Sequence, residues 1–234
     1  MFLDMTGKRV LVTGASRGIG RAVVTAFADQ GAEVHFTHRA SRSELGTPEG
    51  ASVHGHILDM QDTPALRDWF AEFADQYGTL DVLVNNVGGP IKRSSFEDGT
   101  LDLWRQSIAL NLLSVVSTTQ GVLAALRAAA TATGDASIIS ISSISAFHGG
   151  GGDSTHYAAT KAAVQTLTKG LSRELAPSHI RVNALVPSAV DTDFQRDFSS
   201  PERVQRIVDS TPLGRIGTVD DVAGMVLVLA DSQL

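Results

Sequence analysis

The fold is decided by Lys8-Arg9-Val10-Leu11-Val12-Thr13-Gly14-Ala15-Ser16-Arg17-Gly18-Ile19-Gly20, in which a short apolar run leads directly into three spaced glycines. The run contains β-branched residues and stops at Gly14, which is typical of a strand buried on both faces of a sheet. From Gly18 to Gln30 apolar residues recur at helical spacing, and Gly31 follows where a glycine commonly ends a helix. The stretch therefore predicts a strand, a tight turn and a helix.

The same alternation of strand and helix continues along the chain. Further strands are predicted at residues 33–37, 52–58, 80–85, 136–142 and 180–186, and further helices at 63–77, 101–130, 155–176 and 219–230. Residues 187–213 are expected to be irregular. Apolar strands that alternate with helices predict an α/β fold, a doubly wound parallel sheet with helices on both faces. No linker or repeat divides the sequence, so we expect residues 1–234 to form a single domain.

Composition excludes several classes of protein. Of the 234 residues 43% are hydrophobic and 19% are charged, which fits a globular domain and rules out a disordered chain. The 19 basic and 25 acidic side chains give a net charge of −6 at pH 7, so we expect no nucleic-acid partner. The longest apolar runs, such as 225–230, are shorter than the roughly 18–20 residues of a membrane span, and no signal peptide is evident. We therefore expect a cytoplasmic protein that binds no membrane.

Metal binding is not expected either. The chain has no cysteine, which removes thiol catalysis and cysteine-bound zinc. Of the seven histidines, His54 and His56 lie in one predicted strand, but no third ligand stands near them in the sequence.

A ligand site is expected after the strands, because ligands of doubly wound sheets bind beyond the carboxyl ends of the strands. After the first strand, glycines let the backbone turn tightly and let a pyrophosphate approach the N-terminus of the helix. This loop predicts a dinucleotide site made by Gly14, Ser16, Arg17, Gly18, Ile19 and Gly20.

The end of the second strand bears on the choice of dinucleotide. An acidic residue there would accept a hydrogen bond from the 2′-hydroxyl of the adenosine ribose, whereas a basic residue would pair with a 2′-phosphate. Thr37-His38-Arg39 has no carboxylate, and Arg17 and Arg39 carry guanidinium groups suited to phosphate, with Arg42 in reserve. We therefore expect NADP(H) as the cofactor in preference to NAD(H).

Two further strand ends supply candidate cofactor contacts. Asp59 follows the third strand, where its carboxylate can accept a hydrogen bond from an adenine amino group. Asn86 and Gly88 follow the fourth strand, where small residues allow a cofactor to approach closely. The amides of Asn85 and Asn86 have an equally good alternative role, in which they tie neighbouring strands together.

Tyr157 and Lys161 are the candidates for proton transfer. They lie four residues apart on a predicted helix and therefore share one face. A tyrosine is nearly fully protonated at neutral pH, and an ammonium beside it favours the phenolate, which tunes the phenol as an acid or base. Ser142 or Ser143 supplies a hydroxyl at the same edge of the sheet, and Asn111 is a polar residue inside the long helix.

Together these motifs resemble the short-chain dehydrogenase/reductase family over nearly the whole chain. The resemblance rests on residues 13–20, Asp59, residues 85–88, Asn111, Ser142-Ser143, Tyr157-Ala158-Ala159-Thr160-Lys161 and residues 181–187. It implies a Rossmann sheet, a homodimer or homotetramer, and direct hydride transfer between a nicotinamide and a carbonyl or carbinol carbon of a small molecule, without a metal.

The resemblance also implies a role for each catalytic residue. Ser143 would polarise the substrate carbonyl, with Ser142 as the alternative hydroxyl, and Tyr157 would donate the proton. Lys161 would hold the nicotinamide ribose and lower the pKa of the tyrosine, so both residues would contact the cofactor. Asn111 would anchor a water that relays protons to Lys161.

The last part of the chain is interpreted through the same resemblance. Residues 188–213 are similar to the substrate lid of the family, a segment that closes over the site. Pro187 and Thr192, near the start of this segment, would contact the cofactor. The sequence ends where the family continues into a seventh strand, so we expect a sheet of six strands.

The resulting prediction is an NADPH-dependent oxidoreductase that reduces a ketone or a 3-oxoacyl group, similar to the 3-oxoacyl-(acyl-carrier-protein) reductase branch of the family. An NAD(P)-dependent secondary alcohol or sugar dehydrogenase would use the same residues. A non-catalytic NADP-binding module is the alternative from another class, and the presence of both Tyr157 and Lys161 argues against it.

Overall fold

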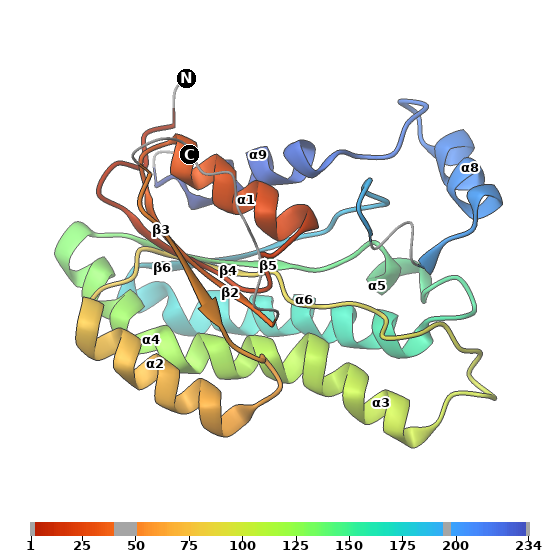
Figure 1. Ribbon diagram of the computed structural model, residues 1–234, viewed down its shortest axis with the longest axis horizontal. Helices are drawn as coiled ribbons and strands as arrows, with labels where there is room; N and C mark the ends of the chain where they lie inside the picture. Colours follow the sequence, from red (N-terminus) through yellow and green to blue (C-terminus); the bar gives the residue numbers. More distant parts are fainter. Residues whose placement is uncertain (1–2, 40–50, 194–197, 233–234) are drawn as a thin grey trace.

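Six parallel strands form a sheet in the order β3-β2-β1-β4-β5-β6 (Figure 1). The structure is a computed structural model that describes residues 3–39, 51–193 and 198–232. The strands are β1 (Arg9–Val12), β2 (Glu33–His38), β3 (Val53–Ile57), β4 (Val82–Asn85), β5 (Ala136–Ile141) and β6 (Ile180–Leu185). Each predicted strand is confirmed to within two residues at either end. The strand order reverses between β1 and β4, and such switch points are where doubly wound sheets bind ligands.

Helices cover both faces of the sheet, as the doubly wound prediction requires (Figure 1). One face carries α1 (Gly18–Asp29) and α9 (Val219–Ala230). The other carries α2 (Thr63–Tyr77), α4 (Ser114–Thr133) and α6 (Thr155–Leu175), which continues into the short turn η2 (Ala176–Ser178). Alternate residues of β1 enter the two cores, Val10 and Val12 on the α1 side and Leu11 on the other.

The predicted long helix is a continuous helical run made of α3 (Leu101–Ile108), η1 (Ala109–Leu113) and α4. The five residues of η1 form a π-helical turn, a widening that often occurs at functional sites. Asn111 lies in this turn and is fully buried. By length and apolar composition alone, residues 101–133 would be long enough to cross a membrane. In this fold, however, part of the run is core, with Val122 and Leu126 buried against the sheet.

The prediction that residues 187–213 are irregular is wrong, because α8 (Pro201–Ser210) lies within them. Proline fits the first turn of a helix, where its fixed φ is suitable and its missing N–H is not needed. Ser200 caps this helix by accepting a hydrogen bond from the Arg203 backbone N–H at 3.3 Å. The short helix α5 (Ser145–His148) was also not predicted.

Candidate active site

A cleft of about 700 Å³ lies at the carboxyl ends of the strands. Most of the residues proposed from the sequence line it. The exceptions are Asn85 and Asn111, which are buried, and Arg42, which lies outside the described residues. Those that line it are Gly14, Ser16, Arg17, Gly18, Ile19, Gly20, Arg39, Asp59, Asn86, Gly88, Ser142, Ser143, Tyr157, Lys161, Pro187 and Thr192. The fold therefore brings the two groups of candidate residues, for the dinucleotide and for catalysis, to one place.

The turn between β1 and α1 has no room for side chains at two of its glycines. Gly14 has a φ of +65°, and a Cβ there would lie 2.6 Å from Cγ2 of Val87. A Cβ on Gly20 would lie 2.8 Å from the carbonyl oxygen of Gly14 and 2.5 Å from the amide nitrogen of Asn86. Bare backbone at these points lets the turn after β1 pack directly against Val87 and Asn86 of the loop after β4.

The amides of Asn85 and Asn86 both make contacts within the protein. Asn86 Nδ2 donates to the carbonyl oxygens of Thr13 at 2.9 Å and Gly14 at 3.0 Å. Asn85 Nδ2 donates to Thr119 Oγ1 at 3.2 Å. Asn86 thus ties the loop after β4 to the turn after β1, which supports the structural one of its two predicted roles, although it also lines the cleft.

The segments after β1, β2 and β3 bring two arginines and one carboxylate to the cleft. Arg39 is exposed there, and Arg17 NH1 lies 3.5 Å from Asp193 Oδ2. Asp59 is exposed as well, and its Oδ1 accepts a hydrogen bond from the backbone N–H of Gln61 at 3.0 Å. The two guanidinium groups and the Asp59 carboxylate therefore lie in the walls of the same cleft, as the sequence predicted.

The structure separates the two candidate hydroxyls. Ser142 is buried, and its Oγ donates to the carbonyl oxygen of Lys161 and accepts from Gln165 Nε2, both at 3.1 Å. The hydroxyl of Ser143 instead forms a hydrogen bond with Tyr157. The geometry favours Ser143 over Ser142 as the hydroxyl that meets a substrate.

Lys161 and Asn111 both approach Gly88. A Cβ on Gly88 would lie 2.7 Å from Lys161 Nζ and 2.7 Å from Asn111 Oδ1. Lys161 Nζ donates to the carbonyl oxygen of Ile141 at 2.8 Å. Asn111 accepts from the Gly89 N–H at 2.8 Å and donates to the Gly89 carbonyl at 3.0 Å. The two Asn111 bonds fix the loop after β4 to the π-helical turn, and the Lys161 ammonium lies beside Gly88 of the same loop.

Burial shifts the pKa values of Tyr157 and Lys161 in opposite directions. Burial lowers the pKa of Lys161 to about 8, because the ammonium loses its solvation. Burial raises the pKa of Tyr157 above its ordinary value, and the hydrogen bond with Ser143 opposes this rise. Lys161 Nζ lies 5.9 Å from the centre of the Tyr157 ring. At pH 7 a protonated phenol therefore stands beside a group that is mostly cationic.

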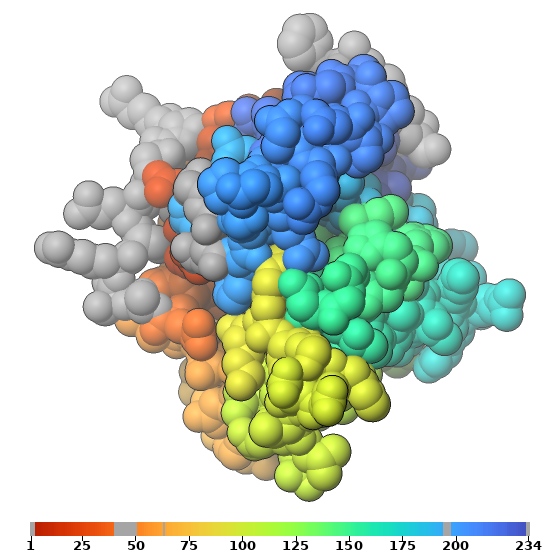
Figure 2. Space-filling model, turned by 90° about the vertical axis from the view of Figure 1, so that its right-hand side faces the viewer, coloured from red at the N-terminus to blue at the C-terminus, as the bar shows by residue number. Residues whose placement is uncertain are grey.

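The sequence reasoning missed two arginines in the wall of the cleft. Arg93 NH1 donates to Asp153 Oδ1 and Arg203 NH1 donates to Asp153 Oδ2, both at 2.8 Å. Arg93 also donates to the carbonyl oxygen of Phe198 and to Ser199 Oγ. These bonds join α8, the loop before α6 and the loop after β4, which meet on the face shown in Figure 2. They connect residues 50 or more positions apart, so no local pattern could reveal them.

A parallel sheet with a glycine turn at its switch point and a Ser-Tyr-Lys group in the same cleft define the Rossmann class of oxidoreductases. A family model described as enoyl-(acyl carrier protein) reductase matches residues 14–234. The chain belongs to the short-chain dehydrogenase/reductase family of oxidoreductases.

Three relatives illustrate the similarity. The 3-oxoacyl-(acyl-carrier-protein) reductase FabG of Chlamydia pneumoniae is 35% identical over 243 residues, which cover 100% of this chain and 93% of the relative. The L-rhamnose 1-dehydrogenase (NAD(P)(+)) of Azotobacter vinelandii is 37% identical over 236 residues, covering 97% and 90%. The crystal structure of a 3-ketoacyl-(acyl-carrier-protein) reductase from Brucella melitensis complexed with NADH superposes with a TM-score of 0.90 at 27% identity, covering 98% and 93%.

Proposed function

We propose that this chain is an NADPH-dependent reductase of a ketone or 3-oxoacyl carbonyl. The observation that carries the proposal is that Ser143, Tyr157 and Lys161 line the same cleft as the glycine turn after β1. A carbonyl group beside Tyr157 would meet a proton donor and a second hydroxyl at once.

The bound nicotinamide would supply the hydride, and the side chains of the cleft would supply the rest. Tyr157 gives its phenolic proton to the carbonyl oxygen as the alcohol forms, and Ser143 donates a hydrogen bond to that oxygen. The ammonium of Lys161 favours the phenolate that remains on Tyr157. Asn111 is a positioning residue. Its two hydrogen bonds hold the backbone of Gly89 in the loop that lies beside Lys161.

The cleft fits a dinucleotide in size and in lining. A volume of about 700 Å³ lies within the ordinary range of cofactor sites. We place the pyrophosphate at residues 14–20, the adenine near Asp59, and the nicotinamide half near Pro187 and Thr192. The preference for NADP(H) rests on Arg17 and Arg39, since one relative is named for NAD(P)(+) and one similar structure holds NADH.

Arg39→Asp tests the choice of cofactor. A charge-assisted hydrogen bond to phosphate contributes about 1.5–3 kcal/mol, so its loss should weaken NADPH binding by roughly 10–100-fold and leave NADH binding much less affected. Fluorescence titration with both cofactors measures the ratio of their dissociation constants. Arg67→Asp, on an exposed position of α2, is the matched control. An unchanged ratio in Arg39→Asp would remove this arginine from the assignment.

Oxidation of a sugar or another secondary alcohol is the second candidate function. It uses the same three side chains in reverse, and the 37% identical L-rhamnose 1-dehydrogenase favours it. The two functions separate on a substrate panel. Consumption of NADPH is followed with ketones, oxoesters, quinones and 3-oxoacyl thioesters, and formation of NADPH or NADH with aldoses and secondary alcohols. Turnover in the first set alone supports the reductase, and turnover in the second set alone replaces it with the dehydrogenase.

A chain that binds NADPH but turns over no substrate in either set would instead be a non-catalytic NADP-binding module.

We also propose that the chain assembles as a homodimer or homotetramer. Large apolar side chains are exposed along α3 and η1, with Leu101, Ile108 and Leu113 at 73%, 38% and 51% of their full exposure. A face of this kind is commonly covered by a second copy. Light scattering after size-exclusion chromatography gives the mass of the assembly, and a monomer at micromolar concentration would contradict the proposal.

A further inference from the structure

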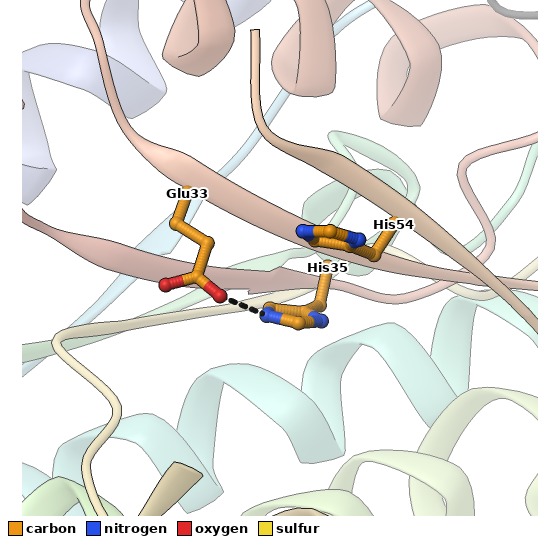
Figure 3. Close-up of side chains that lie close together, drawn as sticks. All are labelled: Glu33, His35 and His54. Atoms are coloured by element: carbon orange, nitrogen blue, oxygen red, sulfur yellow. Dashed lines mark hydrogen bonds and ion pairs between the residues drawn. The ribbon is translucent and has the colours of Figure 1, made fainter.

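Four polar side chains gather between the sheet and α2, where a core would ordinarily be apolar. They are Glu33 and His35 on β2 and His54 and His56 on β3 (Figure 3 shows the first three). None of them lines the active-site cleft. We propose that Glu33, His35 and His54 form a binding site for a divalent transition-metal ion, with Zn²⁺ as the expected occupant.

Sheet register creates this cluster. β2 and β3 are parallel neighbours in which His35 lies directly opposite His54. Glu33 precedes His35 by two residues on β2, so its side chain emerges on the same face. The third ligand that the sequence around His54 and His56 lacks is therefore supplied by another strand, about twenty residues earlier in the chain.

The spacing of the ligand atoms suits one small ion. The candidate atoms of Glu33, His35 and His54 all lie within 4.8 Å of one another. His35 Nε2 is 3.1 Å from Glu33 Oε1. Two ligands of a tetrahedral zinc ion, each about 2.0–2.1 Å from the metal, lie about 3.3 Å apart. Glu33 and His35 are thus nearly in place. The His54 ring is stacked on the His35 ring, with centroids 4.9 Å apart and planes at 24°, and its Nε2 lies 2.9 Å from Ser52 Oγ. The His54 ring therefore has to turn away from Ser52 to direct a nitrogen at the same ion.

Hydrogen bonds from neighbouring groups orient two of these ligands. Arg9 donates to Glu33 Oε2 at 2.8 Å and 3.0 Å, which leaves Oε1 directed at His35. His35 Nδ1 lies 3.1 Å from His56 Nε2. In the tautomer of His35 that carries its proton on Nδ1, this N–H donates a hydrogen bond to His56 Nε2. The lone pair on Nε2 of His35 then stays available to a metal ion. Such support of the outer ring nitrogen is usual for metal-bound histidines.

The kind of ion follows from the ligands and their exposure. Imidazole with one carboxylate suits zinc and its neighbours in the first transition series, whereas calcium and magnesium prefer oxygen ligands throughout. His35 is fully buried, but His54 is exposed and gives an ion a path from solvent. A water can complete the tetrahedron on that side.

The expected effect of the ion is to fasten β3 to β2. Within the described residues β3 is the last strand on its side of the sheet and pairs only with β2. A ligand that binds the folded chain alone raises its stability, by an amount that grows with the excess over Kd. At a hundredfold excess of Zn²⁺ over Kd we expect the Tm to rise by about 5–10 °C.

The experiment uses the full chain without a histidine tag, treated with a chelator and then titrated with ZnCl2 in a calorimeter. We expect one Zn²⁺ per chain, the rise in Tm, and no response to MgCl2. Co²⁺ in place of Zn²⁺ should give the visible absorption of a tetrahedral site. Absence of zinc binding by the wild-type chain would overturn the proposal outright, whatever the variants do.

Variants locate the ion. His54→Gln removes an exposed ligand without disturbing the core. It should raise the Kd for Zn²⁺ by 10-fold or more and lower the rise in Tm at the same ZnCl2 concentration by about half or more. His56→Gln changes the hydrogen-bond partner of His35 Nδ1 and should raise the Kd for Zn²⁺ by about 10–100-fold. The matched control His179→Asn removes an exposed histidine elsewhere and keeps a residue that tolerates its φ of +55°. Equal zinc affinity in His54→Gln and the wild type, or its loss in His179→Asn, would place the ion elsewhere and refute this site.

Discussion

Two of the clusters of titratable side chains in the described part of the chain differ in how their charges are compensated. At the carboxyl ends of the strands Lys161 is buried with a neutral acceptor, the Ile141 carbonyl, on its ammonium. Between β2 and α2, the carboxylate of Glu33 lies between Arg9 and His35, and each of these groups has a partner. The first cluster keeps a charge poorly compensated and next to a cleft, whereas the second is bonded within itself.

This difference shows that a fold can keep a buried charge uncompensated at the place where a ligand binds. A buried charge without an opposite charge destabilises the folded chain, and burial accordingly lowers the pKa of Lys161 to about 8. Burial lowers the pKa of His35 to about 4, although the bond with Glu33 opposes this. The active-site cluster therefore changes charge on the alkaline side of neutrality, and the histidine cluster on the acid side.

Removing a phenolic hydroxyl from each cluster gives the largest contrast. The chain has two tyrosines, Tyr157 in the active-site cluster and Tyr77 against His35. Tyr157→Phe should lower kcat by about 10²–10⁴-fold, because general acid catalysis is lost, while the Kd for NADPH changes little. Tyr77→Phe should leave kcat within about twofold. Steady-state rates and fluorescence titration measure both quantities. Retained turnover in Tyr157→Phe would end the proposed mechanism.

The fold could be predicted from the sequence because its signals are local. Most strands are short runs rich in apolar residues, and each long helix has its own periodicity, so the strand boundaries agree with the structure to within about two residues. The exceptions are the short helix α5 and α8. Residues 187–213 were expected to be irregular, whereas Pro201 stands in the first turn of a helix capped by Ser200.

The candidate site could be predicted only in part, because side-chain partners are not local. The sequence placed Ser142 and Ser143 at one edge, but only the backbone turn after β5 shows that Ser142 points to Lys161 and Ser143 to Tyr157. The histidine cluster was missed for a similar reason. It depends on the register of β2 against β3, which no pattern within either strand reveals.

Lys161→Met tests whether the active-site cluster destabilises the fold. The ordinary pKa of the lysine is 10.5, so between pH 8 and 10.5 the unfolded chain binds a proton that the folded chain has lost, and stability rises with pH by up to about 3 kcal/mol. Lys161→Met should be inactive, more stable than the wild type by about 1–3 kcal/mol at pH 7, and without this alkaline rise.

Urea unfolding at pH 7, 8, 9 and 10 measures the free energy of unfolding for the wild type, Lys161→Met and the control Lys169→Met, an exposed lysine on the same helix. The series stops at pH 10 because Tyr157 titrates above that value and would reverse the slope. A wild type whose stability is flat from pH 8 to 10 would show that the Lys161 charge is compensated, and the contrast between the clusters would disappear.

The acid side tests the other half of the contrast and carries the smallest expected effect. His35 has an ordinary pKa of 6.5 and a pKa of about 4 in the folded chain. As pH falls below 6.5, the imidazole therefore binds a proton in the unfolded chain but stays neutral in the folded chain. Stability should therefore fall between pH 6.5 and 4 by about 2 kcal/mol. Because burial lowers the pKa of the neighbouring His56 as well, this fall belongs to the pair of imidazoles. Glu33 adds little in this window. Burial raises its pKa, but the bonds with Arg9 and His35 outweigh this and hold it below its ordinary 4.5, so its contribution is lost only at lower pH.

His35→Gln, measured in a chelator so that no metal ion contributes, should be less stable at pH 7 because the side chain packs less well, yet it should lose most of the slope between pH 6.5 and 4. His179→Asn removes an exposed histidine and should keep the slope of the wild type. The two observables separate packing from protonation, since a purely structural role of His35 would lower the free energy of unfolding equally at every pH. An equal slope in His35→Gln and the wild type would mean that His35 has nearly the same pKa in the folded and the unfolded chain. Burial would then not keep its imidazole neutral, and the proposed contrast between the two clusters would be wrong.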